Sequence, residues 1–276
     1  MGTASYLIPR MRIVTWNVNS VRARKDRLLA WLSSRRPDVL CLQELKCVEA
    51  DFPLAEVRAL GYHAAIHGQK TWNGVAILAR VPLEEVRHGL RDGVEDPQCR
   101  VLAATVQGVR VYSLYCPNGQ EVGSEAYGYK LAWFARLLRV LQKDESPSAP
   151  LALCGDFNIA PSDLDVHDPA AWAGQTLCTE PERARFQELL SWGLEDTFRR
   201  HHPGQGGLYS WWDYRMLGFP KNRGLRIDHV LATAPLAARC TAAGIDREER
   251  KGKLPSDHAP AWAEFSPGRP PGGDKV

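Results

Sequence analysis

Short polar clusters follow the apolar segments of this 276-residue chain, and they hold side chains that could act together on a substrate. The six clusters are TWNVN (15–19), CLQE (41–44), LYCPNG (114–119), CGDFN (154–158), RIDHV (226–230) and PSDHAP (255–260). Each cluster alone is more typical of a turn, because Asp and Asn often end strands and cap helices. Together they contain Asn17, Glu44, Asp156, Asn158, Asp228, Asp257 and His258. Burying so many carboxylates is costly without a cation or paired donors, so we predict one shared site.

The residue types indicate which metal and which chemistry such a site would support. Carboxylate and amide oxygens suit Mg²⁺ or Mn²⁺, and no Cys/His group in the sequence has zinc spacing. Mg²⁺ uses few carboxylates and leaves positions for phosphate oxygens, which favours phosphoryl chemistry. A pairing of His258 with Asp228 would fix the imidazole tautomer and raise its basicity. Taken alone, His258 is more simply interpreted as a turn residue.

The elements that must position these residues are short strands and amphipathic helices. Nine apolar segments are predicted as strands: 12–16, 38–42, 62–66, 74–79, 101–106, 109–115, 151–154, 226–231 and 261–265. Helices are predicted over 20–34, with Ser20 as N-cap, over 125–142, and from a capping box at Thr179 to a stop near Gly193. Nearly unbroken apolar strands mixed with such helices predict sheets that are buried on both faces. The similar N-x-N (17–19) and D-x-N (156–158) motifs suggest a repeated α/β layer.

Composition sets broad limits on the class of protein. With 44% hydrophobic residues and no long polar linker, the sequence predicts one domain over 11–265, an N-terminal extension over 1–10 and a flexible Pro/Gly-rich tail over 266–276. The net charge of +3 is compatible with a polyanionic partner but is common among enzymes. Seven scattered cysteines without a C-x-x-C pair argue against a disulfide scaffold or a zinc site. We expect a soluble, cytoplasmic protein with no membrane partner, because no apolar segment approaches ~20 residues.

Nine sequence blocks together resemble a known family. In order they are TWNVNSVRAR, PDVLCLQELKC, WNGVAIL, LYCPNG, CGDFNIAPSDLD, EPERARFQELLSWGLEDTFR, YSWWDYR, NRGLRIDHVL and LPSDHAP. They resemble the exonuclease III family of AP endonucleases, within the larger endonuclease/exonuclease/phosphatase fold. The resemblance implies a four-layered α/β sandwich, in which two mixed β-sheets pack face to face with helices outside.

The same resemblance implies an activity and a substrate. It implies a Mg²⁺-dependent phosphodiesterase, with Mn²⁺ as a substitute, that acts in base excision repair. Such an enzyme cleaves 5′ to an abasic site, leaves a 3′-hydroxyl, and carries 3′→5′ exonuclease or 3′-end-cleaning activity. The expected partner is double-stranded DNA with abasic sites or blocked 3′ ends, and the expected state is a monomer.

Site roles are carried over onto the matching positions. The implied metal residues are Glu44 as principal ligand, with Asn17, Asn19 and Asp257 nearby. The implied catalytic residues are Asp156 and Asn158 for the attacking water, Tyr115 for the scissile phosphate or leaving group, and His258 paired with Asp228 for the phosphate or as general base. Whether Asp156 or His258 takes the proton stays open.

Recognition of a missing base implies a small apolar pocket for the extrahelical sugar. Trp211, Leu225 and Ile227 match its walls, although Trp211, Trp212 and Tyr214 are also interpretable as core aromatics. The expected DNA contacts are Arg22, Arg24, Lys25, Trp72, Asn73, Asn118, Lys221 and Asn222, for each of which a solvated surface role is nearly as well supported. Many relatives carry a basic residue where Gln120 and Glu121 stand here. That departure puts product retention, and the balance of exonuclease to endonuclease activity, in question.

Two other functions compete with this interpretation. The first keeps the fold and changes the substrate, as in an inositol phosphate phosphatase, a sphingomyelinase or a nonspecific nuclease. The YSWWDYR and WNVNSVRAR blocks favour DNA repair over these. The second is a non-catalytic DNA-binding protein, which predicts that at least one metal or acid–base residue is lost, and none is.

Overall fold

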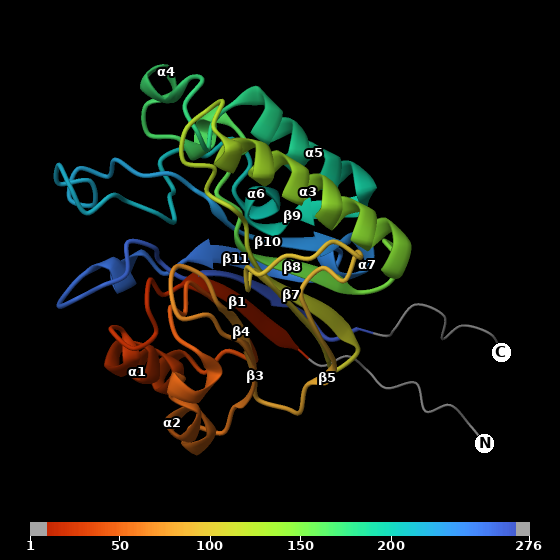
Figure 1. Ribbon diagram of the computed structural model, residues 1–276. Helices are drawn as coiled ribbons and strands as arrows, with labels where there is room; N and C mark the ends of the chain where they lie inside the picture. The colour runs from red at the N-terminus through yellow and green to blue at the C-terminus, as the bar shows by residue number, and fades with distance from the viewer. Residues whose placement is uncertain (1–9, 269–276) are drawn as a thin grey trace.

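Two six-stranded sheets form the centre of the protein, whose computed structural model describes residues 10–268 (Figure 1). The first sheet has the order β11 (Cys240–Ile245), β12 (Ala261–Phe265), β1 (Met11–Asn17), β2 (Val39–Gln43), β4 (Val75–Ala79) and β3 (His63–His67). The second has the order β5 (Glu84–His88), β6 (Val101–Val106), β7 (Val109–Tyr115), β8 (Leu151–Asp156), β10 (Asp228–Thr233) and β9 (Leu194–Asp196). Each sheet is mixed, with one parallel pair, β1–β2 or β7–β8, among antiparallel neighbours.

Three apolar clusters hold four layers together. The inner faces of the two sheets meet in a cluster that includes Ile13, Val39, Val111 and Ala152. The helices α3 (Glu125–Asp144) and α5 (Glu180–Gly193) cover the outer face of the second sheet. The helices α1 (Lys25–Arg35) and α2 (Leu54–Ala59) cover the outer face of the first. The predicted four-layered sandwich is therefore confirmed.

All nine predicted strands are present, but three further strands were missed. These are β5, β9 and β11, whose sequences lack the apolar pattern on which the strand predictions relied. The β5 segment, EEVRH, is a polar edge strand, and β9 has only three residues. The β11 segment, CTAAGI, lies at the other edge and consists mostly of small residues. The strand predicted to begin at Arg226 begins instead at Asp228, because the Arg226 amide donates to Asp165 outside the sheet.

The helix predicted from Ser20 begins five residues later, at Lys25. Asn19 and Ser20 have positive φ values of 45° and 87°, so the chain turns before the helix can start. The Ser20 side chain accepts from the Ala23 amide and caps this turn rather than α1. The capping box at Thr179 is confirmed at the start of α5, and α3 extends two residues beyond its predicted end. Four short helices were not predicted: α2, α4 (Pro169–Trp172), α6 (Thr197–His201) and α7 (Ala234–Ala237). The 3₁₀ turns η1 (Glu49–Asp51), η2 (Asp163–Asp165) and η3 (Arg247–Arg250) were not predicted either.

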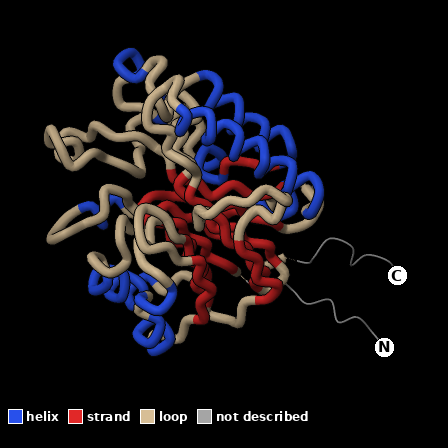
Figure 2. Tube along the Cα trace, in the orientation of Figure 1, coloured by secondary structure: helices blue, strands red, loops and turns tan. Residues whose placement is uncertain are grey.

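Long loops extend from the end of the sandwich opposite the two termini (Figure 2). At the terminal end, Arg10 pairs with Glu264, and the Ser266 amide donates to Arg239. The tail predicted from Ser266 therefore starts with residues that are bonded to the domain. The remainder of both predicted extensions, 1–9 and 269–276, lies outside the described residues. Among residues 10–268, no helix has the length and apolar character needed to cross a membrane.

Candidate active site

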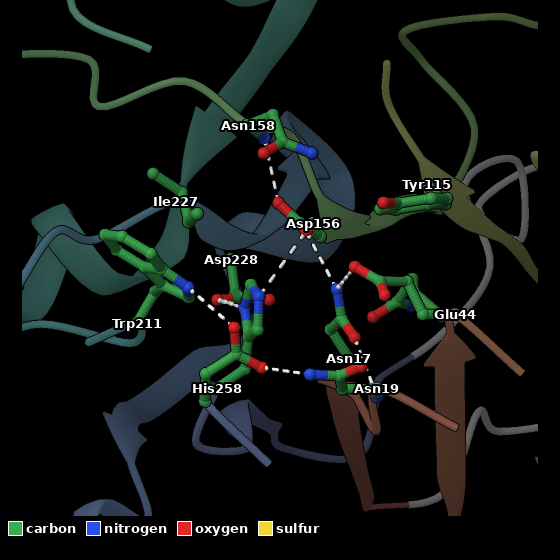
Figure 3. Close-up of polar contacts among 12 residues, drawn as sticks. Asn17, Asn19, Glu44, Tyr115, Asp156, Asn158, Trp211, Ile227, Asp228 and His258 are labelled. Carbon is green, nitrogen blue, oxygen red and sulfur yellow. Dashed lines mark hydrogen bonds and ion pairs between the residues drawn. The ribbon is translucent and has the colours of Figure 1, made fainter. Parts of the chain in front are cut away.

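Strand register brings the predicted polar clusters to one end of the two sheets (Figure 3). In the second sheet, Asp156 at the end of β8 pairs with Tyr115 of β7 and with Asp228 of β10. In the first sheet, β1 ends at Asn17 beside the end of β2, and Glu44 follows directly. His258 lies in the loop before β12 and forms an isolated bridge with Trp211. Residues that are up to 241 positions apart in the sequence, such as Asn17 and His258, therefore share one site.

Asn17 connects the two halves of the site. Its Nδ2 donates to Glu44 Oε1 at 2.8 Å and to Asp156 Oδ2 at 3.0 Å. Its Oδ1 accepts from the Asn19 amide, and Asn19 Nδ2 donates to Asp257 Oδ1 at 2.9 Å. These bonds connect the two sheets, because Asn17 ends β1 and Glu44 follows β2 in one sheet, whereas Asp156 ends β8 in the other.

The donor set fits a divalent cation that prefers oxygen ligands. Ligand atoms of Glu44, Asp156 and His258 lie within 4.8 Å of one another, and the carboxylate oxygens of Glu44 and Asp156 in this group are the ligand type that Mg²⁺ prefers. Asp257 and Asn19 border this group, with the Asp257 carboxylate held by Asn19 and by Trp211. A cation bound here would strengthen the preference for ionised carboxylates.

Lys46 is a site residue that the sequence analysis missed. Its Nζ lies 2.8 Å from Glu44 Oε2 and 2.6 Å from Asn19 Oδ1, and it stands 5.7 Å from the centre of the exposed Trp72 ring. The available signal was its position two residues after Glu44 in the CLQELK segment. Lys46 supplies positive charge beside the carboxylate that we expect to bind metal.

His258 lies between two carboxylates. Its Nδ1 is 2.9 Å from Asp228 Oδ2, as predicted from the sequence, and its Nε2 is 3.8 Å from Asp156 Oδ2. Burial lowers the pKa of His258, but the charges of Asp228 and Asp156 outweigh it and raise the pKa to about 10. Burial, together with Asp228 and Glu44, raises the pKa of Asp156 to about 7, although His258 opposes the rise. These two carboxylates therefore favour the protonated form of the ring, which faces the site.

Asn158 and Tyr115 complete this part of the site. Asn158 has a φ of 50°, and its amide donates to Asp156 Oδ1 at 2.9 Å. Its Oδ1 accepts from Asn118 Nδ2 at 3.0 Å. Burial and the nearby Glu44 and Asp156 raise the pKa of Tyr115 well above its ordinary value, so the phenol stays protonated. The guanidinium of Arg100, also missed in the sequence, stacks 4.8 Å from the Tyr115 ring.

Of the three residues that were predicted to form the sugar pocket, Trp211 is partly exposed, and Leu225 and Ile227 are buried. Trp211 is partly buried, and its Nε1 donates to Asp257 Oδ2 at 3.0 Å. Leu225 and Ile227 are 0% and 2% exposed and pack with Trp211 in a small apolar cluster. Leu225 therefore supports Trp211 from behind, and the wall role of these three residues stays a prediction. The core interpretation holds for Trp212, which is 0% exposed, but not for Tyr214, which is 51% exposed.

The predicted DNA-contact residues fall into exposed and internal groups. Arg22 and Lys25 are paired with Asp51 and Glu56, and Lys221 is exposed. Arg24 donates to the Asn19 carbonyl and to Tyr214, and Asn222 joins Trp212 to Gly207 within its loop. Asn73 is buried, and with Trp72, Arg100, Tyr115 and Asn118 it lines a cavity of about 670 Å³ beside the site. Gln120 and Glu121 are exposed near this cavity.

Comparison with known proteins gives a consistent set of relatives. The sequence profile of the Endonuclease/Exonuclease/phosphatase family matches residues 14–258. Exodeoxyribonuclease III of Haemophilus influenzae is 39% identical over 266 residues, which cover 92% of this chain and 100% of the relative. A structure described as the 3′ phosphatase NExo from Neisseria, bound to a product DNA hairpin, superimposes with a TM-score of 0.89 at 44% identity, covering 93% of this chain and 99% of the other. An AP endonuclease from Archaeoglobus fulgidus superimposes with a TM-score of 0.88 at 37% identity, covering 92% of this chain and 99% of the other.

Proposed function

Since this chain belongs to the endonuclease/exonuclease/phosphatase family, we propose that it is a metal-dependent DNA-repair nuclease that cleaves on the 5′ side of abasic sites. We propose in addition that it removes nucleotides or blocking groups from 3′ ends. The similarity to an exodeoxyribonuclease III, a 3′ phosphatase and an AP endonuclease supports both activities. One phosphodiesterase or phosphomonoesterase site would serve all of them, because each reaction transfers a phosphoryl group to water.

The observation that carries this proposal is the Asp228–His258–Asp156 arrangement beside Glu44. The His258 ring and the carboxylates of Asp228 and Asp156 lie together in a largely buried site. Asn17 is hydrogen-bonded to both Asp156 and Glu44. A turn histidine or a surface acid has no need of such partners. A non-catalytic DNA-binding protein would have no reason to maintain so costly an arrangement.

We propose Mg²⁺, with Mn²⁺ as substitute, as the metal. Glu44 and Asn17 would hold it, with Asp257 and Asn19 at the margin. When bound, the cation would neutralise charge that develops on the phosphate oxygens. Asp156 would then be ionised more readily, because a nearby cation favours the carboxylate.

The residues of the chain itself divide the remaining tasks. Asp228 fixes the His258 ring through Nδ1, so that Nε2 can donate a hydrogen bond to a phosphate oxygen. A histidine between two carboxylates stays charged, and Asp156 is therefore the better acceptor for the proton of the attacking water. Asn158 and Asn118 orient that water and the phosphate, and Tyr115 donates to the phosphate or the leaving oxygen.

Specificity for a missing base would come from exclusion. We propose that Trp211, backed by Leu225 and Ile227, faces a space that fits a sugar without its base. The seven cysteines are free thiols, as a reducing compartment maintains them, which supports a cytoplasmic location.

The deciding experiment compares three duplexes that carry one abasic analogue, one 3′-phosphate or no lesion. We expect Mg²⁺-dependent cleavage 5′ to the abasic analogue and release of phosphate from the blocked end, with much slower attack on intact DNA. Activity that survives complete chelation would contradict the metal assignment. Equal cleavage of damaged and intact duplexes would indicate a general nuclease instead.

A further inference from the structure

Lys130 and Glu182 form a fully buried ion pair outside the proposed active site. Lys130 lies on α3 and Glu182 on α5, with 2.5 Å between Nζ and Oε1 and 0% exposure of either side chain. The free-energy cost of removing two charges from water is often larger than the gain from their attraction in the protein interior. Stability alone is therefore a poor explanation for the pair, and its other contacts suggest a different one.

Those contacts lead to two site loops. Lys130 Nζ also donates to the carbonyl of Asn158 at 2.6 Å and to the carbonyl of Asn118 at 3.0 Å. An ammonium has three donors, and all three are used. Glu182 in turn accepts from the amides of Leu177 and Thr179, which fixes the carboxylate at the start of α5.

Both loops have backbone conformations that need support. Asn158 has a φ of 50°, in the left-handed region that non-glycine residues seldom adopt. Gly119, which follows Asn118, has a φ of 90°, and a Cβ there would lie 3.0 Å from Lys130 Cδ. The Asn118 loop therefore lies directly on the Lys130 side chain. Such conformations persist where surrounding contacts hold them in place.

We infer that the Lys130–Glu182 pair is a positioning device for the reaction. The pair holds the backbone of Asn158 and Asn118, and these two residues in turn hold site groups. Asn118 Nδ2 donates to Asn158 Oδ1, and the Asn158 backbone amide donates to Asp156 Oδ1. Lys130 thus acts on the water-positioning group through the backbone without contacting the reacting atoms. The inference rests on the proposed function of Asp156 and Asn158.

The test removes the pair without leaving a buried unpaired charge. The double variant Lys130→Met/Glu182→Gln keeps the site neutral but loses the bonds to both carbonyls. We expect kcat on the abasic duplex to fall by about 10²-fold, since displacements of about 1 Å cost that much. KM should change less, because the exposed DNA-contact residues Arg22, Lys25 and Lys221 are untouched. The matched control is Arg136→Met/Asp92→Asn, which removes an ion pair of 2.6 Å from the same helix without contacting the site.

A double-mutant cycle distinguishes positioning from general loss of stability. In an Asn158→Ala background, which keeps the backbone bonds of residue 158 but lacks the water-positioning side chain, the pair variant should lower kcat by a smaller factor than it does in the wild type, because part of what Lys130 positions is already gone. Additive losses, or a loss no larger than that of the Arg136 control, would overturn the inference. If the double variant does not fold, Lys130→Leu/Glu182→Gln replaces it, because leucine also lacks the donors to both carbonyls, and wild-type turnover of that folded enzyme would also overturn the inference. A wild-type enzyme inactive on all damaged duplexes would overturn the proposed function as well, whereas wild-type cleavage with an unaffected pair variant overturns the inference alone.

Discussion

At the scale of single residues, the site depends on charges that are buried together and compensate one another. Asn17 donates to the carboxylates of Glu44 and Asp156, and Lys46 pairs with the other oxygen of Glu44. His258 lies between Asp228 and Asp156. Each of these groups would be unfavourable if buried alone. Removal of one partner should therefore lower the stability of the fold as well as impair metal binding or turnover.

Glu44→Ala tests the metal site. The carboxylate is expected to bind the cation directly, so its loss should raise the Mg²⁺ requirement by more than the roughly 10–100-fold that an outer partner costs. Titration of cleavage rate against Mg²⁺ measures this shift. Glu49→Ala, an exposed acid five residues later, is the control and should leave the titration unchanged. An unaltered Mg²⁺ requirement in Glu44→Ala would remove this residue from the metal site.

His258→Ala and Asp156→Asn test the acid–base assignment. Each should lower kcat by about 10²–10⁴-fold, because each removes a charge that the transition state needs. Binding to a labelled abasic duplex should persist. The control is His63→Ala, an exposed histidine on β3. Near wild-type turnover in both variants would show that the catalytic groups lie elsewhere.

Trp211→Ala tests discrimination between abasic and intact DNA. Loss of ring packing worth about 1–3 kcal/mol should reduce the preference for the abasic duplex by roughly ten- to a hundredfold. Since the metal residues are untouched, the remaining cleavage should keep its Mg²⁺ dependence. Relative kcat/KM on the two duplexes gives the result, with Trp192→Ala on α5 as the control. A preference equal to that of the wild type would exclude Trp211 from the pocket.

At the scale of elements, a buried network fixes the entry to β10. Arg226 Nε donates to Asp165 of η2 at 2.6 Å, and Arg226 Nη2 donates to Asp196 of β9 at 2.7 Å. Arg226 lies between Leu225 and Ile227 and two residues before Asp228. The network therefore holds both the base of the proposed pocket and the carboxylate that orients His258.

This network should be visible in acid unfolding. Burial raises the pKa of Asp165, but the Arg226 charge outweighs it and lowers the pKa from 3.8 to about 2. A carboxyl with a lowered pKa in the folded state stabilises the protein above pH 3.8 and loses that contribution as the pH falls through about 2. We expect Asp165 to account for about 2 kcal/mol of the decrease in unfolding free energy between these values.

Denaturant unfolding at a series of pH values measures this contribution. Asp165→Asn should be less stable at pH 7 and should lose less stability in acid than the wild type. Glu195→Gln serves as the control, because its pairing with Arg200 is exposed and such pairs contribute little. Identical acid dependence in wild type and Asp165→Asn would contradict the assignment.

At the scale of the whole molecule, a net charge of +3 gives little long-range attraction to DNA. Binding must then depend on local basic loops around the site. Arg22 and Lys25, both exposed enough to reach a phosphate, are paired with Asp51 and Glu56 in the free protein. DNA would compete with these weak surface pairs.

The salt dependence of binding tests this view. Each phosphate contact contributes about 0.9 to the slope of log K against log salt, so Arg22→Ala/Lys25→Ala should flatten the slope by roughly two units. The control Arg35→Ala/Arg80→Ala removes the same charge from pairs with Asp246 and Asp38, and Asp38 precedes β2 at the opposite end of the sheet. An equal change in both variants would show that only net charge matters.

The fold class, and several residues that lie together in the candidate site, could be predicted from the amino-acid sequence. Buried strands such as Val101–Val106 were predictable from their own apolar residues, and the Thr179 capping box from local hydrogen-bonding chemistry. The pairing of Asp228 with His258 was predictable because few partners of the right type were available. These features depend on residue types over short segments.

Features that depend on contacts between residues far apart in the sequence could not be predicted from it. Edge strands such as β5 and β11 have little apolar signal of their own and form because a neighbouring strand offers hydrogen bonds. The start of α1 was mispredicted because the turn at Asn19 and Ser20 is imposed by contacts with Glu44 and Leu45. A lysine on an amphipathic helix is usually exposed, yet Lys130 is fully buried, because Glu182 of α5 and the carbonyls of Asn118 and Asn158 in two loops compensate its charge. Burial of a charged group depends on the whole set of partners, and that set exists only after the chain has folded.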